Sequence, residues 1–226
     1  MPGQGAWAQE AVRRGLEMAV SAVALVLFSP VFGAIALLIW LDSGLPIFYR
    51  GYRVGRGSRT FRMIKFRTLP NGTEGKVGSR LIKPEEEREA TPLGQLLRET
   101  KLDELPQLVN VLAGQMSLVG PRANRPSYYQ EWSQHIPGYR FRTLVKPGMT
   151  GLAQVFGDYY TPPHAKLRYD RLYILRRSLR LDLWLVMLTI GRLAGGKRLI
   201  RGRVRARRPL PTPATWPPGL EEIPAR

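Results

Sequence analysis

The longest apolar stretch in the sequence runs from Met18 to Leu41 and contains no charged residue. A straight helix of that length would measure about 36 Å, enough to cross a hydrocarbon core of about 30 Å. The stretch is too long for the apolar region of a signal peptide, and no small-residue cleavage pattern follows it. The pattern therefore predicts a membrane-inserted segment that stays in the mature protein.

A Ser-Pro pair interrupts this run near its centre. Pro30 removes a backbone donor and disfavours helical geometry at Ser29, so the helix breaks or kinks there. Membranes tolerate kinked helices, and a bent spanning helix is one interpretation. Cations flank the run on both sides, and the positive-inside rule then places both ends on one side of the membrane. These cations are Arg13, Arg14, Arg50, Arg53 and Arg56. We therefore expect a re-entrant helix hairpin broken at Ser29 and Pro30.

The next segment is strongly cationic. Cations recur at every third position from Arg50 to Lys65, which suits neither a one-faced strand nor a single helical stripe. Gly55 and Gly57 indicate a turn, so we expect a small β-hairpin. On its own, this segment is also typical of a solvated basic surface.

A polar, turn-rich loop between Pro70 and Ala90 is expected to act as a mobile lid. Thr91 and Pro92 then give the pattern of a helix start, with a capping side chain followed by a proline at the first helical position.

A second helix is predicted by apolar positions spaced for one buried face. These positions are Leu105, Leu108, Val109 and Leu112. Pro106 limits where the helix starts and Gly114 where it ends. Asp103 and Glu104 are therefore expected at or just before its N-terminus.

Lys166 to Leu193 mixes large apolar residues with arginines at near-helical spacing. We expect either a helix in the headgroup plane with snorkelling arginines or a core helix with a basic exposed face. From Gly195 onward the chain is Arg-rich and then Pro-rich, which predicts a disordered tail that adheres to anionic lipid.

The formal net charge of +18 at pH 7 predicts attraction to polyanions: nucleic acid, an anionic membrane surface or phosphorylated substrates. The absence of cysteine excludes disulfides and thiolate metal sites, and two histidines argue against a zinc or haem centre. Any metal would be a hard cation with oxygen ligands.

The adjacent carboxylates of Asp103 and Glu104 are the candidate catalytic groups. Such a pair is commonly a helix cap and an exposed acid. Here Arg98 precedes the pair and Arg122 follows it in a Gly-Pro-Arg sequence. Neighbouring cations depress a carboxylate pKa, so we expect both acids to be ionised. That state suits a nucleophile or a metal ligand rather than a general acid.

Several sequence blocks together strongly resemble the bacterial sugar transferase family, the monotopic polyprenyl-phosphate phosphoglycosyl transferases. They are "RRGLE", "FSPVF", "FRMIKFRTL", "LRETKLDELPQLVNVLAGQMSLVGPR" and "KPGMTGLAQV", in that order and spacing. The resemblance covers Arg13 to Arg192, and the "LDELPQL…MSLVGPR" block is its most specific part.

The resemblance implies an enzyme that moves a sugar 1-phosphate from a UDP-sugar to undecaprenyl phosphate and releases UMP, as the first membrane step of glycan biosynthesis. It implies that Asp103 is the nucleophile of a phosphosugar-aspartyl intermediate and that Glu104 binds Mg²⁺. The acceptor is already a phosphate anion and needs no general base, which favours a covalent or metal-binding role for a carboxylate.

Further site residues are expected to bind the substrates. Lys65, Arg67, Arg98 and Arg122 would neutralise charge on the transferring phosphoryl group. Asp170 aligns with another acid of the family and is included as a substrate-binding residue.

The predicted fold class is α+β, in a monotopic protein on the cytoplasmic face of the bacterial inner membrane. Its expected parts are an N-terminal re-entrant segment (1–45), a catalytic domain with interfacial helices (46–194) and the basic tail (195–226). Anionic lipids are expected partners, and an oligomer is compatible with the sequence.

Two other functions compete with this interpretation. A membrane-tethered nucleic-acid-binding protein would use Arg on phosphates and Tyr or Trp on bases, but it leaves the "LDELPQL" block unexplained, so no nucleic acid is expected. A scaffold for glycan assembly without activity differs from the enzyme only if Asp103 is dispensable.

Overall fold

The computed structural model describes residues 4–70, 90–157 and 161–194. The loop expected to act as a lid lies almost wholly outside these residues, and the predicted C-terminal tail lies entirely outside them. The described chain combines helices with two small sheets, which confirms the α+β class.

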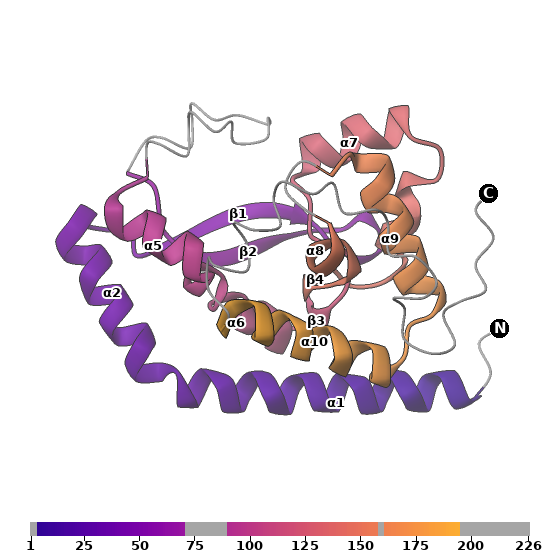
Figure 1. Ribbon diagram of the computed structural model, residues 1–226, viewed down its shortest axis with the longest axis horizontal. Helices are drawn as coiled ribbons and strands as arrows, with labels where there is room; N and C mark the ends of the chain where they lie inside the picture. The colour runs from indigo at the N-terminus through magenta and orange to yellow at the C-terminus, as the bar shows by residue number, and fades with distance from the viewer. Residues whose placement is uncertain (1–3, 71–89, 158–160, 195–226) are drawn as a thin grey trace.

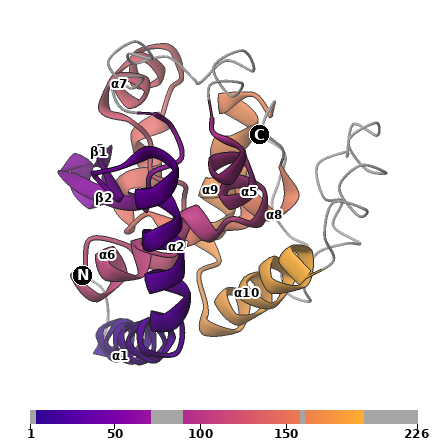
Figure 2. The same cartoon turned by 90° about the vertical axis from the view of Figure 1, so that its left-hand side faces the viewer.

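The helices are α1 (Gln4–Leu27), α2 (Ser29–Ser43), α5 (Pro92–Thr100), α6 (Gln107–Leu112), α7 (Pro126–His135), α8 (Leu152–Phe156), α9 (Pro163–Leu175) and α10 (Leu179–Ala194). The strands are β1 (Phe48–Val54), β2 (Thr60–Phe66), β3 (Ser117–Val119) and β4 (Gly148–Thr150). Short 3₁₀ turns are η1 (Arg56–Ser58), η2 (Leu102–Glu104) and η3 (Tyr139–Leu144). α1 runs along the lower edge of the molecule and α2 along one side (Figure 1), while the β1–β2 hairpin lies at an outer edge in the second view (Figure 2).

The apolar run breaks at the predicted Ser-Pro pair. α1 ends at Leu27, Pro30 lies in the first turn of α2, and the two helix axes differ in direction by 60°. Ser29 Oγ donates to the carbonyl of Val26 at 2.8 Å. By length and apolar composition, no single helix of the described residues qualifies as a membrane span, whereas this bent pair does.

α1 starts well before the apolar run and packs on the rest of the chain. Arg14 donates to the carbonyls of Val111 and Leu112 at 2.6 and 2.7 Å, which caps the C-terminus of α6. Arg13 Nε lies 2.8 Å from Asp182 Oδ2 on α10. These contacts place α10 and α6 beside α1, on the lower side of the molecule in both ribbon views (Figure 2).

The predicted cationic hairpin is confirmed. β1 and β2 pair antiparallel, with Tyr49 opposite Lys65 and Arg53 opposite Phe61. Gly57 in the turn has a φ of 64°, a left-handed conformation that favours glycine. One face of the hairpin carries buried Phe61 and Met63, which pack against α6 and β3. Part of the hairpin is therefore core rather than a wholly solvated surface.

The first helix start is confirmed, and the predicted buried face of the second helix is partly wrong. The Thr91 hydroxyl accepts from Gly94 N at 3.0 Å, and Pro92 opens α5. In α6, however, Val109 is 42% exposed, while Asn110 is buried. Asn110 Oδ1 accepts from Ile64 N at 2.9 Å, so a polar side chain joins α6 to β2. An apolar pattern does not reveal such a contact.

β3 and β4 form a parallel pair that fixes the Gly-Pro-Arg loop. Gly120 N donates to Thr150 O at 2.8 Å, and Gly148 N donates to Pro121 O at 2.9 Å. A Cβ atom on Gly120 would lie 2.5 Å from Lys146 O, so the two backbones approach too closely for a side chain there. The segment from Lys166 to Leu193 forms two helices, α9 and α10, which pack through Tyr173 and Leu185 into one core.

Candidate active site

The adjacent acids lie on the short turn between α5 and α6. Lys101 adopts a left-handed conformation with φ 61° and ends α5, and η2 then carries Asp103 and Glu104. Both acids thus precede α6, as the sequence predicts. The Asp103 residue is only 7% exposed. A carboxylate at this depth requires charged or hydrogen-bonding neighbours.

Two cations from distant parts of the chain converge on a single oxygen of Glu104. Lys65 Nζ, from β2, lies 2.8 Å from Glu104 Oε1. Arg122 Nη2, from the loop after β3, lies 2.9 Å from the same oxygen. The Lys65 ammonium is also 3.8 Å from Asp103 Oδ2. Both acids and both cations therefore form one cluster.

Asp103 retains an oxygen that no protein group occupies. Among the described residues, Asp103 Oδ1 is buried and has no hydrogen-bond partner. Leaving a buried oxygen without a hydrogen-bond partner costs free energy, so this oxygen is available to interact with a bound group. The Arg122 side chain, by contrast, is 51% exposed, so the cluster has one open, cationic side.

The two acids have different electrostatics. Burial acts to raise the pKa of Glu104, but Arg122 and Lys65 outweigh it and hold the pKa well below its usual range. For Asp103, burial is the largest influence and raises the pKa against the opposing effect of Lys65. The expected depression of both pKa values is thus confirmed for Glu104 and wrong for Asp103. Burial of Lys65 lowers its pKa.

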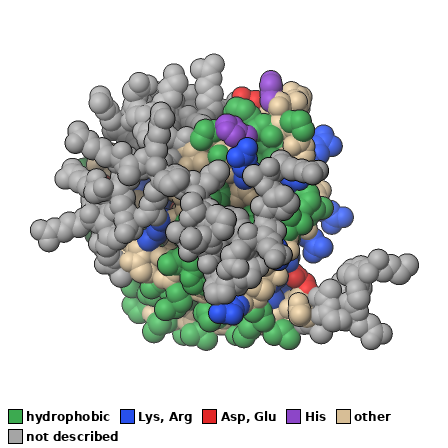
Figure 3. All heavy atoms as spheres, turned by 45° about the vertical axis from the view of Figure 1, so that its right-hand side comes forward, with side chains coloured by type: hydrophobic (Ala, Val, Ile, Leu, Met, Phe, Trp, Pro, Cys, Tyr) green, Lys and Arg blue, Asp and Glu red, His purple; other side chains and the backbone are tan. Residues whose placement is uncertain are grey.

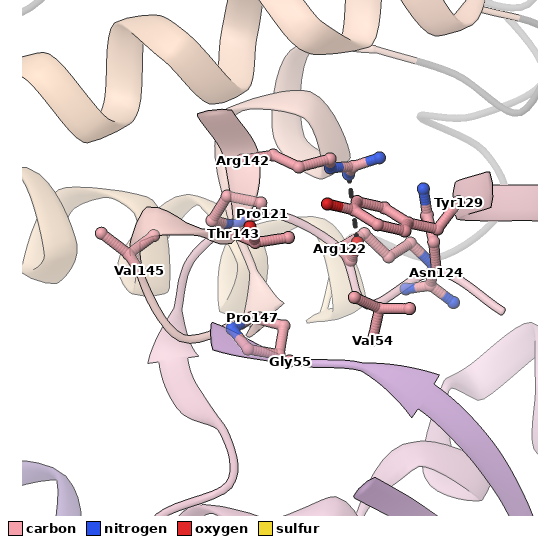
Figure 4. Close-up of a pocket in the computed structure, with 10 residues that line it drawn as sticks. All are labelled: Val54, Gly55, Pro121, Arg122, Asn124, Tyr129, Arg142, Thr143, Val145 and Pro147. Carbon is pink, nitrogen blue, oxygen red and sulfur yellow. Dashed lines mark hydrogen bonds between the residues drawn. The ribbon is translucent and has the colours of Figure 1, made fainter. Parts of the chain in front are cut away.

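A buried ion pair supports the backbone of Arg122 from behind. Arg142 Nη2 donates to the Arg122 carbonyl at 3.1 Å (Figure 4). The same nitrogen lies 2.9 Å from Asp170 Oδ2. Arg142 Nη1 also donates to the Tyr139 hydroxyl at 2.6 Å, which in turn accepts from Asn124 at 2.8 Å. The Arg142 and Asp170 side chains are 7% and 2% exposed. This network fixes the loop that presents Arg122.

The remaining predicted residues lie around the cluster rather than in it. Arg67 donates to the carbonyls of Ser43 and Gly44 at 2.8 and 2.7 Å, at the end of α2. Arg98 Nε donates to Thr68 Oγ1 at 2.8 Å. These contacts tie α2 and α5 to the chain that leaves β2.

Asp170 differs most from its expected role. Its carboxylate pairs with Arg142, which contacts the backbone carbonyl of Arg122. The acid pair, by contrast, lies at the guanidinium end of the Arg122 side chain. Arg142 and Tyr139 were not singled out in the sequence, because they lie in an irregular segment and their roles depend on contacts with α9 and the loop at Arg122.

The residues suit a metal that takes few protein ligands. Within the described ranges, no group of three or more His, Asp or Glu side chains is placed to hold a metal. Mg²⁺ commonly binds one or two carboxylates and completes its shell with substrate phosphates and water. The carboxylate of Glu104 is a hard oxygen donor of this kind, and both cations of the cluster contact its Oε1. The arrangement therefore fits Mg²⁺ held jointly with a phosphorylated substrate.

Comparison with known proteins identifies the family. The model of the bacterial sugar transferase family matches residues 8–196, and the chain belongs to this family. It is 37% identical over 182 residues to the UDP-N-acetylgalactosamine-undecaprenyl-phosphate N-acetylgalactosaminephosphotransferase of Aeromonas hydrophila, covering 79% of this chain and 43% of the relative. The chain thus spans less than half the length of that relative.

Shorter relatives match over most of their length. A UDP-glucose:undecaprenyl-phosphate glucose-1-phosphate transferase of Caulobacter vibrioides is 36% identical over 183 residues, covering 79% of this chain and 68% of the relative. The exopolysaccharide production protein ExoY of Rhizobium meliloti is 34% identical over 191 residues, covering 79% of this chain and 83% of the relative.

Proposed function

We propose that this member of the bacterial sugar transferase family transfers a sugar 1-phosphate from a UDP-sugar to undecaprenyl phosphate and releases UMP. The names of the relatives support this substrate pair. The observation that carries the proposal is the buried Asp103 carboxylate, whose Oδ1 has no hydrogen-bond partner among the described residues and whose Oδ2 lies 3.8 Å from Lys65 Nζ. Such a carboxylate, held next to positive charge, suits a nucleophile in covalent transfer of a phosphoryl group.

In the proposed first step, an oxygen of the ionised Asp103 forms a bond to the sugar-side phosphorus of the donor. The bond between this phosphorus and the bridging oxygen breaks, and that oxygen keeps the electron pair and leaves on UMP. Lys65 and Arg122 offset the negative charge that the transferring group carries. The product on the enzyme is a phosphosugar-aspartyl intermediate, an acyl phosphate.

In the proposed second step, a phosphate oxygen of the acceptor lipid bonds to the same phosphorus and Asp103 leaves as a carboxylate. No proton has to be removed from the acceptor, since its phosphate is already anionic near neutral pH. The raised pKa of Asp103 makes it a more basic, stronger nucleophile once ionised.

Glu104 is the proposed magnesium ligand. Its depressed pKa keeps it ionised, and its contacts with Lys65 and Arg122 orient the carboxylate. Bound there, Mg²⁺ would offset charge on the donor diphosphate.

The exposed apolar side chains of α1, α2 and α10 form the proposed membrane-facing surface. Figure 3 shows hydrophobic side chains gathered along the lower edge of the molecule, where Figure 1 places α1, and α2 rises from the end of α1 along one side. The exposed apolar side chains include Val20, Val23, Val26, Leu27, Leu38, Trp40, Leu41, Leu183, Met187 and Ile190. Exposed apolar side chains gathered in this way are typical of a membrane contact.

We propose that the bent pair α1–α2 enters the cytoplasmic leaflet of the bacterial inner membrane and returns to the same side. The 60° bend at the Ser29-Pro30 pair and the basic residues on both sides support this monotopic arrangement. The acid pair would then face a lipid phosphate at the membrane surface.

Release of UMP tests the proposed function. The full chain, purified in nanodiscs with Mg²⁺ and undecaprenyl phosphate, should release UMP from at least one member of a panel of UDP-sugars. Glu104→Gln and Asp103→Asn variants should not. If the wild-type chain releases no UMP from any UDP-sugar while its fold is intact, the proposed activity is wrong.

A further inference from the structure

The inward face of the β-hairpin continues beyond Lys65. Side chains of a strand alternate between its faces, and the register pairs Tyr49 with Lys65 and Arg53 with Phe61. Tyr49, Gly51 and Arg53 therefore share the face from which Lys65 reaches the acid pair. Residues of the other face, such as Tyr52 and Arg62, point away from the acids.

Gly51 leaves room on this face for two polar side chains. A Cβ atom at Gly51 would lie 3.0 Å from Arg53 Nη1 and would overlap the Tyr49 side chain. Both side chains thus lie over the glycine, and Arg53 Nη1 donates to the Tyr52 carbonyl at 2.8 Å. The fold brings the Arg53 guanidinium back along the strand, toward the position of Lys65.

The Gly-Pro-Arg loop closes over the same face. Val54 N donates to the carbonyl of Asn124 at 2.9 Å, which joins the end of β1 to this loop. Burial lowers the pKa of Arg53, and the charges of Arg125 and Arg122 lower it further. The three guanidinium groups therefore lie near one another, and Arg122 pairs with Glu104.

The positive charge on this face exceeds what the acid pair neutralises. Lys65 and Arg122 already share Glu104, so Arg53 adds a cation to a partly buried surface. Concentrated cations of this kind are typical of sites for phosphate groups, and the planar guanidinium suits phosphate oxygens.

Resting on the proposed transfer, we infer that Arg53 binds the nucleoside-side phosphate of the donor, the phosphate that leaves on UMP. The sugar-side phosphorus must lie at Asp103, where Lys65 is placed. Arg53 lies farther along the same face, and the second phosphate of a diphosphate is directly bonded to the first through one oxygen. The Tyr52 carbonyl orients the guanidinium through Nη1, and its other nitrogens remain donors for a phosphate oxygen.

This contact would favour the first step of the transfer. When the phosphorus–oxygen bond breaks, the bridging oxygen keeps the electron pair and the departing phosphate gains negative charge. A guanidinium at that phosphate stabilises the leaving group. Arg53 would therefore act on the nucleotide, while Lys65 and Arg122 act on the group that is transferred.

Binding of UMP and UDP to matched variants tests this inference. The hairpin carries a second Tyr-Arg pair on its other face, where Arg62 Nη2 donates to the Tyr52 hydroxyl at 3.1 Å. Arg62→Ala therefore removes the same charge from the same hairpin and serves as the control for Arg53→Ala. Each protein would be embedded in nanodiscs and titrated calorimetrically with UMP or with UDP, in the presence of Mg²⁺. The titrations would give the Kd of each nucleotide.

We expect Arg53→Ala to raise the Kd of UMP and the Kd of UDP by the same factor, about ten- to a hundredfold, as expected for loss of a charge-assisted hydrogen bond. Arg53→Lys should recover part of the affinity, which shows that the hairpin is intact. Arg62→Ala should leave both Kd values unchanged.

Other results would overturn the inference in distinct ways. If Arg53→Ala weakens the binding of UDP but not of UMP, Arg53 contacts the sugar-side phosphate. If it leaves both affinities unchanged but raises the KM for undecaprenyl phosphate, Arg53 contacts the acceptor. If Arg62→Ala loses as much affinity as Arg53→Ala, Arg53 acts only through the general positive charge of the hairpin. If the wild-type chain binds neither nucleotide, the proposed donor itself is wrong, and the inference with it.

Discussion

Lys65 and Glu104 form a direct ion pair, 2.8 Å between Nζ and Oε1, that joins the β-hairpin to the turn before α6. The pair connects segments that are far apart in the sequence, and Arg122 joins it from a third. Because one Glu104 oxygen serves both cations, each cation keeps hydrogen-bonding capacity for a substrate phosphate.

Removal of either cation should slow the reaction. Lys65→Ala and Arg122→Ala are expected to lower turnover about tenfold to a thousandfold, the range for loss of a preorganised charge at a transferring phosphoryl group. Steady-state UMP release would measure it. Arg62→Ala, on the outer face of the hairpin, is the matched control, and an equal loss there would contradict a specific role for the two cations.

The rate should depend on pH through Asp103 and Lys65. Burial raises the Asp103 pKa above its usual 3.8, so kcat/KM should rise with pH through a value higher than 3.8. Burial lowers the Lys65 pKa below 10.5, so the rate should fall at a pH lower than 10.5, as the ammonium loses its charge.

A Lys65→Arg variant checks the assignment of the basic limb. Arginine stays charged throughout this range, so the fall at high pH should move upward or disappear. A basic limb that does not move would assign the fall to another group.

The buried Arg142–Asp170 pair should contribute to the stability of the fold and, through the Arg142 contact with the Arg122 carbonyl, to turnover. Asp170→Asn leaves the Arg142 charge without its partner, which is expected to cost about 3 kcal/mol or more in the free energy of unfolding. Chemical denaturation would measure this cost.

The double variant Arg142→Met/Asp170→Leu separates the two effects. Apolar replacement of both partners should restore much of the stability. It also removes the donor to the Arg122 carbonyl, so turnover should stay low. Full recovery of turnover would mean that Arg142 does not position Arg122.

The proposed monotopic arrangement predicts that both ends of the bent helix pair lie on one side of the membrane. The chain has no cysteine, so single cysteines at Gln9 and Arg56 give clean labels. A membrane-impermeant thiol reagent should reach neither in intact cells and both after lysis. Labelling of one site alone in intact cells would contradict the arrangement. Pro30→Ala should favour a straight, membrane-spanning helix, so in this variant the reagent should label one of the two sites in intact cells.

Features set by local backbone chemistry were predictable from the sequence. Pro30 located the break between α1 and α2, Gly55 and Gly57 the hairpin turn, and Thr91 the start of α5. Each depends on a residue that restricts or frees the backbone at its own position.

Features set by tertiary contact were not predictable. The polar side chain of Asn110 decides which face of α6 is buried, and Arg142 reaches Asp170 from a distant irregular segment. The raised pKa of Asp103 was missed for the same reason, because the sequence reveals nearby charges but not the burial that outweighs them.

The central claim is that Asp103 forms a covalent bond to the sugar phosphate, and a single-turnover experiment without acceptor tests it most directly. The wild-type chain, mixed with its UDP-sugar and Mg²⁺, should release a burst of UMP equal to the amount of enzyme. Intact-protein mass spectrometry should detect one added sugar phosphate that hydroxylamine removes, and Asp103→Asn should lack both signals. Turnover with acceptor but no burst and no adduct in the wild-type chain would contradict the covalent mechanism, as would normal turnover by Asp103→Asn.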